Sequence, residues 1–249
     1  MKTLAFANQK GGVAKTTSTF TIGNILASLD PESKILMIDF DPQGSLSVAC
    51  GIDQLTLAKS MYDVITEGAA IKDILVNVCN KENLYLAPST IDLSSSELSL
   101  VTQMSRETVL RNKITELGTE FDYVLIDCSP SLSLLTINAL TAADKLIIPC
   151  SADYLAYKGL TLLIDTVNKI KTLTNPNIEV AGVITTLYNS RTLHCKEVLE
   201  ILEEEYQVLG VVGVSTQVKD AMLDSLSIYD VNKKHPISQS YLKIVKEII

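Results

Sequence analysis

A glycine-rich segment with two lysines and two threonines lies close to the N-terminus of the chain. It reads Lys10-Gly11-Gly12-Val13-Ala14-Lys15-Thr16-Thr17 and follows an apolar run at residues 3–7. Paired glycines let the backbone turn with its N–H groups facing inward, where they hold phosphate oxygens, and the start of a helix favours the same anions. Lysine adds a mobile positive charge, and a threonine hydroxyl is a ligand for Mg²⁺. The spacing predicts that Lys15 contacts the β- and γ-phosphates of a nucleotide and that Thr16 holds Mg²⁺.

Carboxylates end two further apolar runs. Asp39 and Asp41 follow residues 35–38, and Asp127 follows residues 123–126. Ligands of open α/β sheets bind at the carboxyl ends of the strands, so we expect these three carboxylates close to the glycine-rich segment. Because Mg²⁺ keeps several waters and takes few protein ligands, Asp127 is predicted to bind a water of the metal's shell.

Short apolar runs alternate with helix-length amphipathic segments along the chain. We expect strands at 3–8, 34–39, 84–88, 122–127, 144–149, 178–185 and 209–213, and helices at 15–29, 94–117, 132–142, 157–173, 192–206, 217–224 and 237–248. Runs that are apolar on both faces are typical of a covered parallel sheet, and the alternation indicates βαβ units. The sequence therefore predicts an α/β fold with a mostly parallel, twisted sheet and helices on both faces. The absence of repeats and long linkers favours one domain over residues 1–249.

The composition excludes several classes of protein. The chain has 249 residues, of which 47% are hydrophobic and 20% are charged, and these values are typical of a well-packed domain. No run of about 18 apolar residues predicts a transmembrane helix, and the chain enters its first strand directly, without a signal peptide. The five cysteines form no CxxC pair, so we expect reduced thiols rather than a disulfide framework or a metal site. A cytoplasmic location follows as an expectation.

The glycine-rich segment resembles the deviant Walker A box, KGGxxK(S/T), of the ParA/MinD-type P-loop ATPases. Residues 38–43 resemble the second box of that family, IDxDPQ, and residues 127–130 its DxPP loop, with Ser129 in place of one proline. The resemblance continues through residues 148–160, 182–192 and 214–221, and so covers nearly the whole chain. It is strongest to the small ParA/Soj-type chromosome or plasmid partition ATPases that have no N-terminal helix-turn-helix domain.

This resemblance implies a role for each residue of the site. ATP and Mg²⁺ are the implied ligands, and Lys10 reaches across a dimer interface to stabilise the charge that develops on the partner's nucleotide. Asp41 positions and polarises the attacking water, and Asp39 supports Mg²⁺ or its water shell. Gln217 stands in the adenine-side segment of the family and is expected to form a hydrogen bond to the base.

Two positions bear on contact with DNA. In the DNA-binding members of the family, an arginine of the SRT stretch and the second arginine of PRNVR contact DNA phosphates; here these positions hold Arg191 and Lys219. Lysine neutralises a phosphate but lacks the bidentate geometry of arginine. The net charge of −8 opposes binding to DNA, although residues 215–249 carry five lysines against four acidic residues. We expect a weak, non-specific patch that dimerisation doubles and that salt weakens.

The implied function is that of a Mg²⁺-dependent ATPase acting as an ATP-sandwiched homodimer. The dimer binds DNA of the nucleoid non-specifically, and a ParB-like centromere-binding partner stimulates its weak hydrolysis and moves or positions a replicon. Two alternatives stay open. One is a MinD-like switch that cycles on a membrane through residues 241–249, whose apolar positions form a helical stripe. The other is a low-turnover, nucleotide-switched scaffold for a protein cargo.

Overall fold

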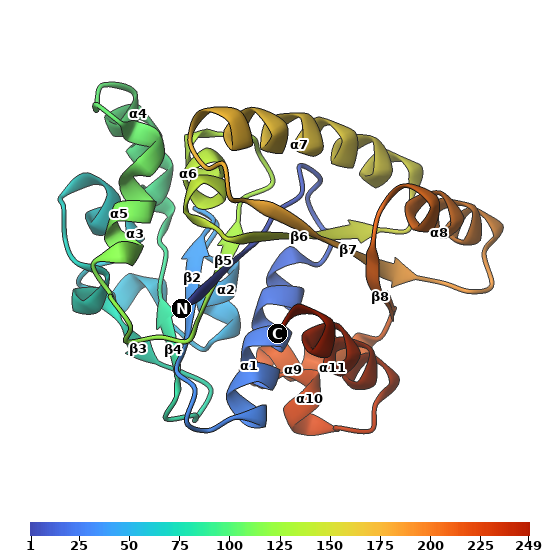
Figure 1. Cartoon of the computed structure of the whole chain (residues 1–249). Helices are drawn as coiled ribbons and strands as arrows, with labels where there is room; N and C mark the ends of the chain where they lie inside the picture. The colour runs from blue at the N-terminus through green and yellow to red at the C-terminus, as the bar shows by residue number, and fades with distance from the viewer.

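The computed structural model describes residues 1–249, and its strands join one eight-stranded sheet (Figure 1). The strand order is β3-β4-β2-β5-β1-β6-β7-β8, and every pair is parallel except β3 with β4. The strands are β1 (Lys2–Phe6), β2 (Ile35–Phe40), β3 (Val76–Asn77), β4 (Leu84–Ala87), β5 (Tyr123–Cys128), β6 (Lys145–Ser151), β7 (Glu179–Tyr188) and β8 (Val208–Gly213). The predicted α/β fold with a mostly parallel sheet is confirmed.

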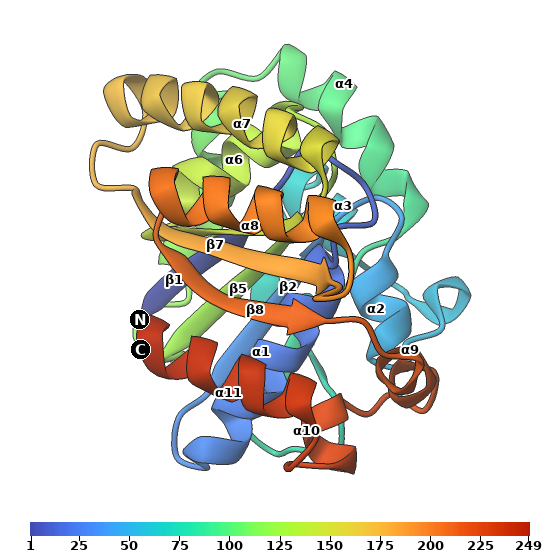
Figure 2. The same cartoon turned by 90° about the vertical axis from the view of Figure 1, so that its right-hand side faces the viewer.

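Helices cover both faces of this sheet (Figures 1 and 2). The α-helices are α1 (Lys15–Leu29), α2 (Ser45–Ala49), α3 (Met61–Thr66), α4 (Ser96–Val101), α5 (Val109–Thr115), α6 (Leu134–Ala142), α7 (Tyr154–Leu173), α8 (Leu193–Glu205), α9 (Thr216–Leu223), α10 (Ile228–Val231) and α11 (Pro236–Ile248). Four short 3-10 helices are η1 (Gln54–Thr56), η2 (Ile71–Ile74), η3 (Ile91–Ser95) and η4 (Arg106–Thr108).

Side chains alternate between the two faces of the sheet along each strand, so each face carries its own apolar layer. In β1, Leu4 and Phe6 pack into the layer under α1 and α11, whereas Ala5 points into the layer under α6 and α7. Both layers are needed because the central strands are buried on both sides, which explains their continuous apolar runs. The sheet is therefore a rigid platform, and the loops at its carboxyl edge are free to carry chemistry.

The C-terminal helix α11 uses its apolar stripe inside the protein. Ile237, Tyr241, Ile244 and Ile248 are buried, and α11 packs against α1 and β8 (Figure 2). The Tyr241 hydroxyl lies 3.0 Å from the Ser18 hydroxyl of α1. The stripe predicted for residues 241–249 therefore exists, but it covers the sheet and is not presented to a membrane. No helix in the structure has the length and apolar character needed to cross a bilayer.

The single helix predicted for residues 94–117 is wrong. The segment is divided into α4, η4 and α5, with Ser105 in the left-handed backbone region at φ 53°. Asn138 of α6 holds the break, because its amide donates to the Arg106 carbonyl at 2.8 Å and accepts from the Leu110 N–H at 3.2 Å. A contact from outside the segment thus satisfies the backbone groups that a continuous helix would have paired internally.

Candidate nucleotide-binding site

The glycine-rich loop lies where the order of the sheet reverses. In the sheet, β5 and β2 lie on one side of β1, and β6 lies on the other side. The chain goes first from β1 to β2 and later crosses to β6. Ligands of doubly wound sheets bind at such a point, at the carboxyl ends of the strands. The loop of residues 9–14 follows β1 directly and leads into α1, so its backbone N–H groups and the N-terminus of that helix face the same space.

Two residues give this loop its shape through left-handed backbone conformations. Gly12 has φ 74°, which glycine adopts without steric cost. Ala14 has φ 63° immediately before α1 begins, although its methyl group disfavours that conformation. Strain of this kind persists when the surrounding structure enforces it, and it is concentrated at functional sites.

Lys15 is a buried cation without a counterion. Its ammonium donates to the Lys10 carbonyl at 3.2 Å, and it makes no ion pair. Burial lowers the pKa of Lys15, while the negative charges of Asp127 and Asp41 act in the opposite direction. A buried ammonium with only a carbonyl partner fits a site that expects an anion such as a phosphate.

Asp39 and Asp127 lie side by side at the ends of β2 and β5, where the strand register pairs them. Both are fully buried. Burial raises the pKa of Asp39 to about 7, and burial together with the charge of Asp39 raises the pKa of Asp127 to about 8. Two adjacent buried carboxylates are unfavourable in the absence of a cation, so the donor set fits a hard divalent ion such as Mg²⁺.

Hydroxyl groups hold these two carboxylates in place. Thr16 donates to Asp127 at 2.6 Å, and Thr19 donates to the other oxygen at 3.3 Å. Ser47 of α2 donates to Asp39 through both its backbone N–H and its hydroxyl, each at 2.7 Å. Each side chain is therefore fixed by donors from a neighbouring helix.

Asp41 points into a cleft of about 470 Å³ at the rim of the loop. Gly11, Gly12, Lys15 and Thr16 line the same cleft. The Gln43 N–H donates to the Asp41 carboxylate at 2.9 Å, which fixes the start of the turn after β2. The structure thus brings Asp41, Lys15 and Thr16 together, as the sequence predicts.

Lys10 directly precedes Gly11, which lines this cleft, and is paired within its own chain. Its ammonium is 2.6 Å from a carboxylate oxygen of Asp153, the residue that caps α7. Burial raises the pKa of Asp153, but the hydrogen bonds from Lys10 and Ser151 outweigh it and hold the pKa below its usual value. About a third of each side chain in the pair is exposed, so the pair is accessible from solvent.

Comparisons with known proteins find relatives that cover most of this chain. A family profile described as an AAA domain matches residues 1–180. The chromosome-partitioning ATPase Soj of Treponema pallidum is 35% identical over 251 residues, which cover 100% of this chain and 97% of Soj. The chain belongs to the ParA/Soj family of partition ATPases.

Two further proteins are similar to this member of the ParA/Soj family. An uncharacterised protein of Mycobacterium tuberculosis is 40% identical over 206 residues, and the match spans 82% of this chain but only 64% of that protein. One crystal structure from Mycobacterium smegmatis is named cobyrinic acid a,c-diamide synthase and contains a bound ATP analogue and magnesium. This chain matches it with a TM-score of 0.85 and 33% sequence identity. It covers 99% of this chain and 93% of its own. The synthase activity in that name refers to the M. smegmatis protein and not to this chain.

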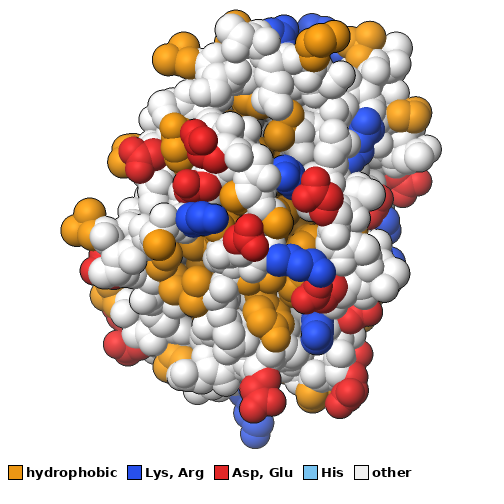
Figure 3. All heavy atoms as spheres, turned by 90° about the vertical axis from the view of Figure 1, so that its left-hand side faces the viewer, with side chains coloured by type: hydrophobic (Ala, Val, Ile, Leu, Met, Phe, Trp, Pro, Cys, Tyr) orange, Lys and Arg blue, Asp and Glu red, His pale blue; other side chains and the backbone are white.

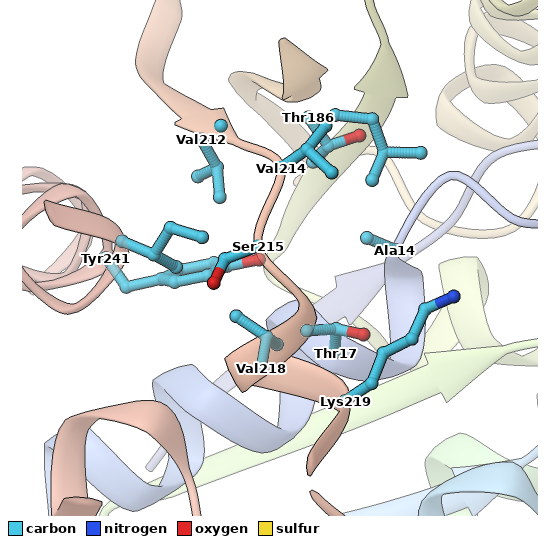
Figure 4. Close-up of a pocket in the computed structure, with 12 residues that line it drawn as sticks. Ala14, Thr17, Thr186, Val212, Val214, Ser215, Val218, Lys219 and Tyr241 are labelled. Atoms are coloured by element: carbon cyan, nitrogen blue, oxygen red, sulfur yellow. The ribbon is translucent and has the colours of Figure 1, made fainter. Parts of the chain in front are cut away.

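A second hollow of about 150 Å³ adjoins the cleft of this ParA/Soj-type chain (Figure 4). It is mainly apolar, and its walls include Ala14 and Thr17 of the loop and α1, Val218 of α9 and Tyr241 of α11. Its position beside the phosphate cleft and its size suit a flat, apolar base. Gln217, which is predicted to form a hydrogen bond to the base, is exposed to solvent and does not line this hollow.

The two residues predicted to contact DNA lie at the carboxyl ends of neighbouring strands. Arg191 is in the loop between β7 and α8, Lys219 is on α9 after β8, and both are exposed. Lys219 also lines both the cleft and the base-sized hollow, where Figure 4 draws it on α9 beside the start of α1. On the face at the β3 edge, acidic and basic side chains are interspersed and form no continuous basic area (Figure 3).

Several supporting residues were missed by sequence reasoning. Ser47 and Thr19 hold the two buried carboxylates, and Asn8 links the loop to β6 through a hydrogen bond from its amide to the Pro149 carbonyl at 2.8 Å. Asn8 also accepts from the Lys10 N–H at 3.0 Å. The position of Thr19, one helical turn after Thr16 and on the same face of α1, was the signal available for that residue.

Proposed function

We propose that this ParA/Soj-family ATPase hydrolyses ATP with Mg²⁺ as an ATP-sandwiched homodimer that binds DNA non-specifically. The observation that carries the proposal is the buried, unpaired Lys15 ammonium beside two buried carboxylates and a glycine-rich loop. This arrangement is costly without ligands and becomes favourable when an anionic nucleotide and a divalent cation fill it. The T. pallidum relative is named a chromosome-partitioning ATPase, which supports the same reading.

Each residue of the cleft has a distinct role in this proposal. Lys15 and the N–H groups of residues 11–16 bind the β- and γ-phosphates, and Thr16 would ligate Mg²⁺ once it turns its hydroxyl from Asp127. Asp127 and Asp39 would hold Mg²⁺ through waters of its shell. Mg²⁺, when bound, neutralises charge on the phosphate oxygens. Asp41 accepts a hydrogen bond from the attacking water and orients it towards the γ-phosphorus.

Lys10 couples hydrolysis to dimerisation in this proposal. Its pairing with Asp153 keeps the ammonium at the rim of its own cleft, from which it can be released towards the nucleotide of a second subunit. A cation supplied from the partner stabilises charge that develops in the transition state. A lone subunit therefore has an incomplete site, so basal hydrolysis is weak and a ParB-like centromere-binding partner is needed to stimulate it.

DNA binding rests on Arg191 and Lys219 at the same edge as the cleft. Dimerisation doubles the number of these cations and so makes the affinity for phosphate backbone depend on ATP. Association with the nucleoid and movement or positioning of a replicon follow from a cycle of binding, stimulated hydrolysis and release.

The test is binding to a random-sequence DNA duplex with ADP and with ATP·Mg²⁺, at low and moderate salt. Binding that requires ATP, weakens with salt and is lost in Arg191→Ala and Lys219→Ala supports the proposal. Lys171→Ala is the matched control, because Lys171 is an exposed lysine in the last turn of α7. Absence of DNA binding in a protein that still forms an ATP dimer contradicts the DNA switch.

The net charge of −8 favours one second candidate, a low-turnover scaffold that binds a protein cargo in its ATP state. That protein would dimerise with ATP but would not bind DNA at any salt concentration. The MinD-like alternative loses its structural support, because the α11 stripe is packed against α1 and β8. Sedimentation with anionic vesicles and ATP tests the membrane alternative directly, and binding to the vesicles would support it.

A further inference from the structure

Two of the five cysteines meet on the side of the sheet opposite to α6 and α7. Cys50 ends α2, and Cys79 lies in the turn between β3 and β4. Both side chains belong to the same apolar layer and line the same hollow, and the interaction between the two thiols lowers the pKa of Cys79. Of the other three thiols, none is paired with a second cysteine.

The turn that carries Cys79 is tight and unusual. Cys79 and Asn80 both have left-handed backbones, at φ 57° and 52°, and the Lys81 N–H donates to the Val78 carbonyl at 3.2 Å. Positive φ at both central residues defines a type I′ turn, in which asparagine and glycine are preferred. A cysteine at the first of these positions is disfavoured, and the turn places Cys79 at the wall of the hollow that Cys50 also lines.

Polar neighbours make the two sulfurs unequal. The Asn24 amide donates to the Cys79 sulfur at 3.8 Å, and its carbonyl accepts from the Lys81 ammonium at 2.7 Å. Lys81 is also paired with Asp230 at 2.8 Å, which anchors the network. The hydrogen bond from Cys50 lowers the pKa of Cys79, helped by Asn24 and Lys81, whereas burial raises the pKa of Cys50.

The thiol whose pKa is lowered is also the more accessible one. Cys79 is half-buried and Cys50 is buried, and both line a hollow of about 330 Å³ that Asp224 and Ser225 close from the α9–α10 side. A small oxidant such as hydrogen peroxide fits this space. An accessible thiolate next to a second thiol is the arrangement found in redox-sensing cysteine pairs.

We propose that Cys50 and Cys79 form a peroxide-sensitive pair that closes reversibly to a disulfide. The Cys79 thiolate attacks one oxygen of hydrogen peroxide, the O–O bond breaks, and hydroxide leaves and takes up a proton to give water. The product is a sulfenic acid on Cys79. The Cys50 sulfur then attacks the Cys79 sulfur, the S–O bond breaks, and the proton of Cys50 leaves with the hydroxyl group as a second water. Two thiols are oxidised and one peroxide is reduced, and a small dithiol reverses the change.

The disulfide would act on the nucleotide site through α2. Cys50 is three residues after Ser47, which holds Asp39 by two hydrogen bonds of 2.7 Å. A covalent link from Cys50 to the β3–β4 turn fixes the end of this short helix and with it the loop that carries Asp41. We therefore expect oxidation to slow ATP turnover, an effect that rests on the proposed function.

The experiment treats the full chain with hydrogen peroxide and measures its intact mass, followed by peptide mapping. We expect a loss of two hydrogen atoms, assigned to a peptide pair joined through Cys50 and Cys79 and reversed by dithiothreitol. Cys50→Ser should instead trap Cys79 as a sulfenic acid that dimedone labels, because the resolving thiol is gone. Cys195→Ser is the matched control, since Cys195 is a buried thiol that contacts His194 and no cysteine, and it should keep the full mass loss.

Mass loss that survives in Cys79→Ser, or peroxide treatment that leaves both thiols free, overturns the proposal. The mass readout needs no nucleotide, so it stands even if the chain proves to be a poor ATPase. ATP turnover of the oxidised and the re-reduced protein is the second measurement. Equal turnover in the two forms overturns the link to the nucleotide site.

Discussion

The side of the site proposed to bind phosphate and the side proposed to bind the base and DNA differ in how firmly they are built. At the ends of β1, β2 and β5, Lys15, Asp39 and Asp127 are buried, and every carboxylate has a donor within 3.3 Å. At the ends of β7 and β8, Arg191 and Lys219 are exposed. A buried polar group without its partner is costly, whereas an exposed cation can change with little effect on the fold. The phosphate side therefore tolerates little variation, and the outer side is where members of a family can differ.

Replacing Lys15 tests the buried side most directly. Lys15→Ala should weaken ATP binding by about 3 kcal/mol, or about 100-fold, because a charge-assisted contact to phosphate is lost. Calorimetric titration with ATP·Mg²⁺ measures the loss. Lys171→Ala at the far end of α7 should leave the affinity unchanged. Wild-type affinity in Lys15→Ala would contradict the assignment of the phosphate site.

Asp41 separates hydrolysis from binding. Asp41→Ala should lower turnover by at least about 100-fold, because the attacking water is no longer oriented. ATP affinity should be nearly unchanged, so an ATP-bound dimer should accumulate. Phosphate release together with light scattering reports both properties, and normal turnover would remove Asp41 from the mechanism.

Replacing Asp127 tests whether the buried carboxylates lower the stability of the protein without ligands. Asp127→Asn removes a carboxyl group whose charged form is disfavoured by burial beside Asp39, while its side-chain oxygen can still accept from Thr16. Without Mg²⁺ and nucleotide we expect the variant to be more stable by about 1 kcal/mol, a rise in Tm of roughly 2–4 °C. Mg²⁺-dependent ATP binding should fall at the same time. A lower Tm would mean that the carboxylate pair stabilises the empty site.

Asp153 gives the smallest expected effect, because it lies at the rim between the two sides. Asp153→Asn should free Lys10 while keeping the N-terminal cap of α7, and the pair is worth less than about 1 kcal/mol. The ATP-dependent dimer should therefore tighten by about two- to fivefold in sedimentation experiments. Asp165→Asn makes the same charge change on the exposed face of α7 and serves as the control. A weaker dimer in Asp153→Asn alone would show that the pair supports the interface.

The sequence predicts well the strands and the clustering of Lys15, Thr16 and the carboxylates, because both depend on local patterns. Each of the seven expected strands is present, and Asp39 and Asp127 meet because parallel neighbours end at one edge. The two-residue strand β3 and the short helices α2, α3 and α10 carry too few residues for a periodic signal. The break in residues 94–117 depends on Asn138, which is distant in sequence.

The base-sized hollow shows the same limit of sequence reasoning. Its walls come from the loop, β7, β8, α9 and α11, so no single segment of the sequence predicts it. Gln217 lies in the expected segment, but the helical phase of α9 turns Val218 inward and leaves Gln217 in solvent. The motif points to a helix that borders the hollow, and only the packing of α9 on the sheet determines which of its residues face that hollow.

Tyr241 belongs to the wall of this hollow and to the packing of the C-terminal helix. Its ring lines the hollow, and its hydroxyl contacts Ser18, one turn into the helix that starts at Lys15. A ligand that fills the hollow therefore adds contacts to α11 and raises the free energy of its local opening. The amide hydrogens of α11 should exchange with deuterium more slowly when a nucleotide is bound, so the last helix reports occupancy of a site formed largely by the first.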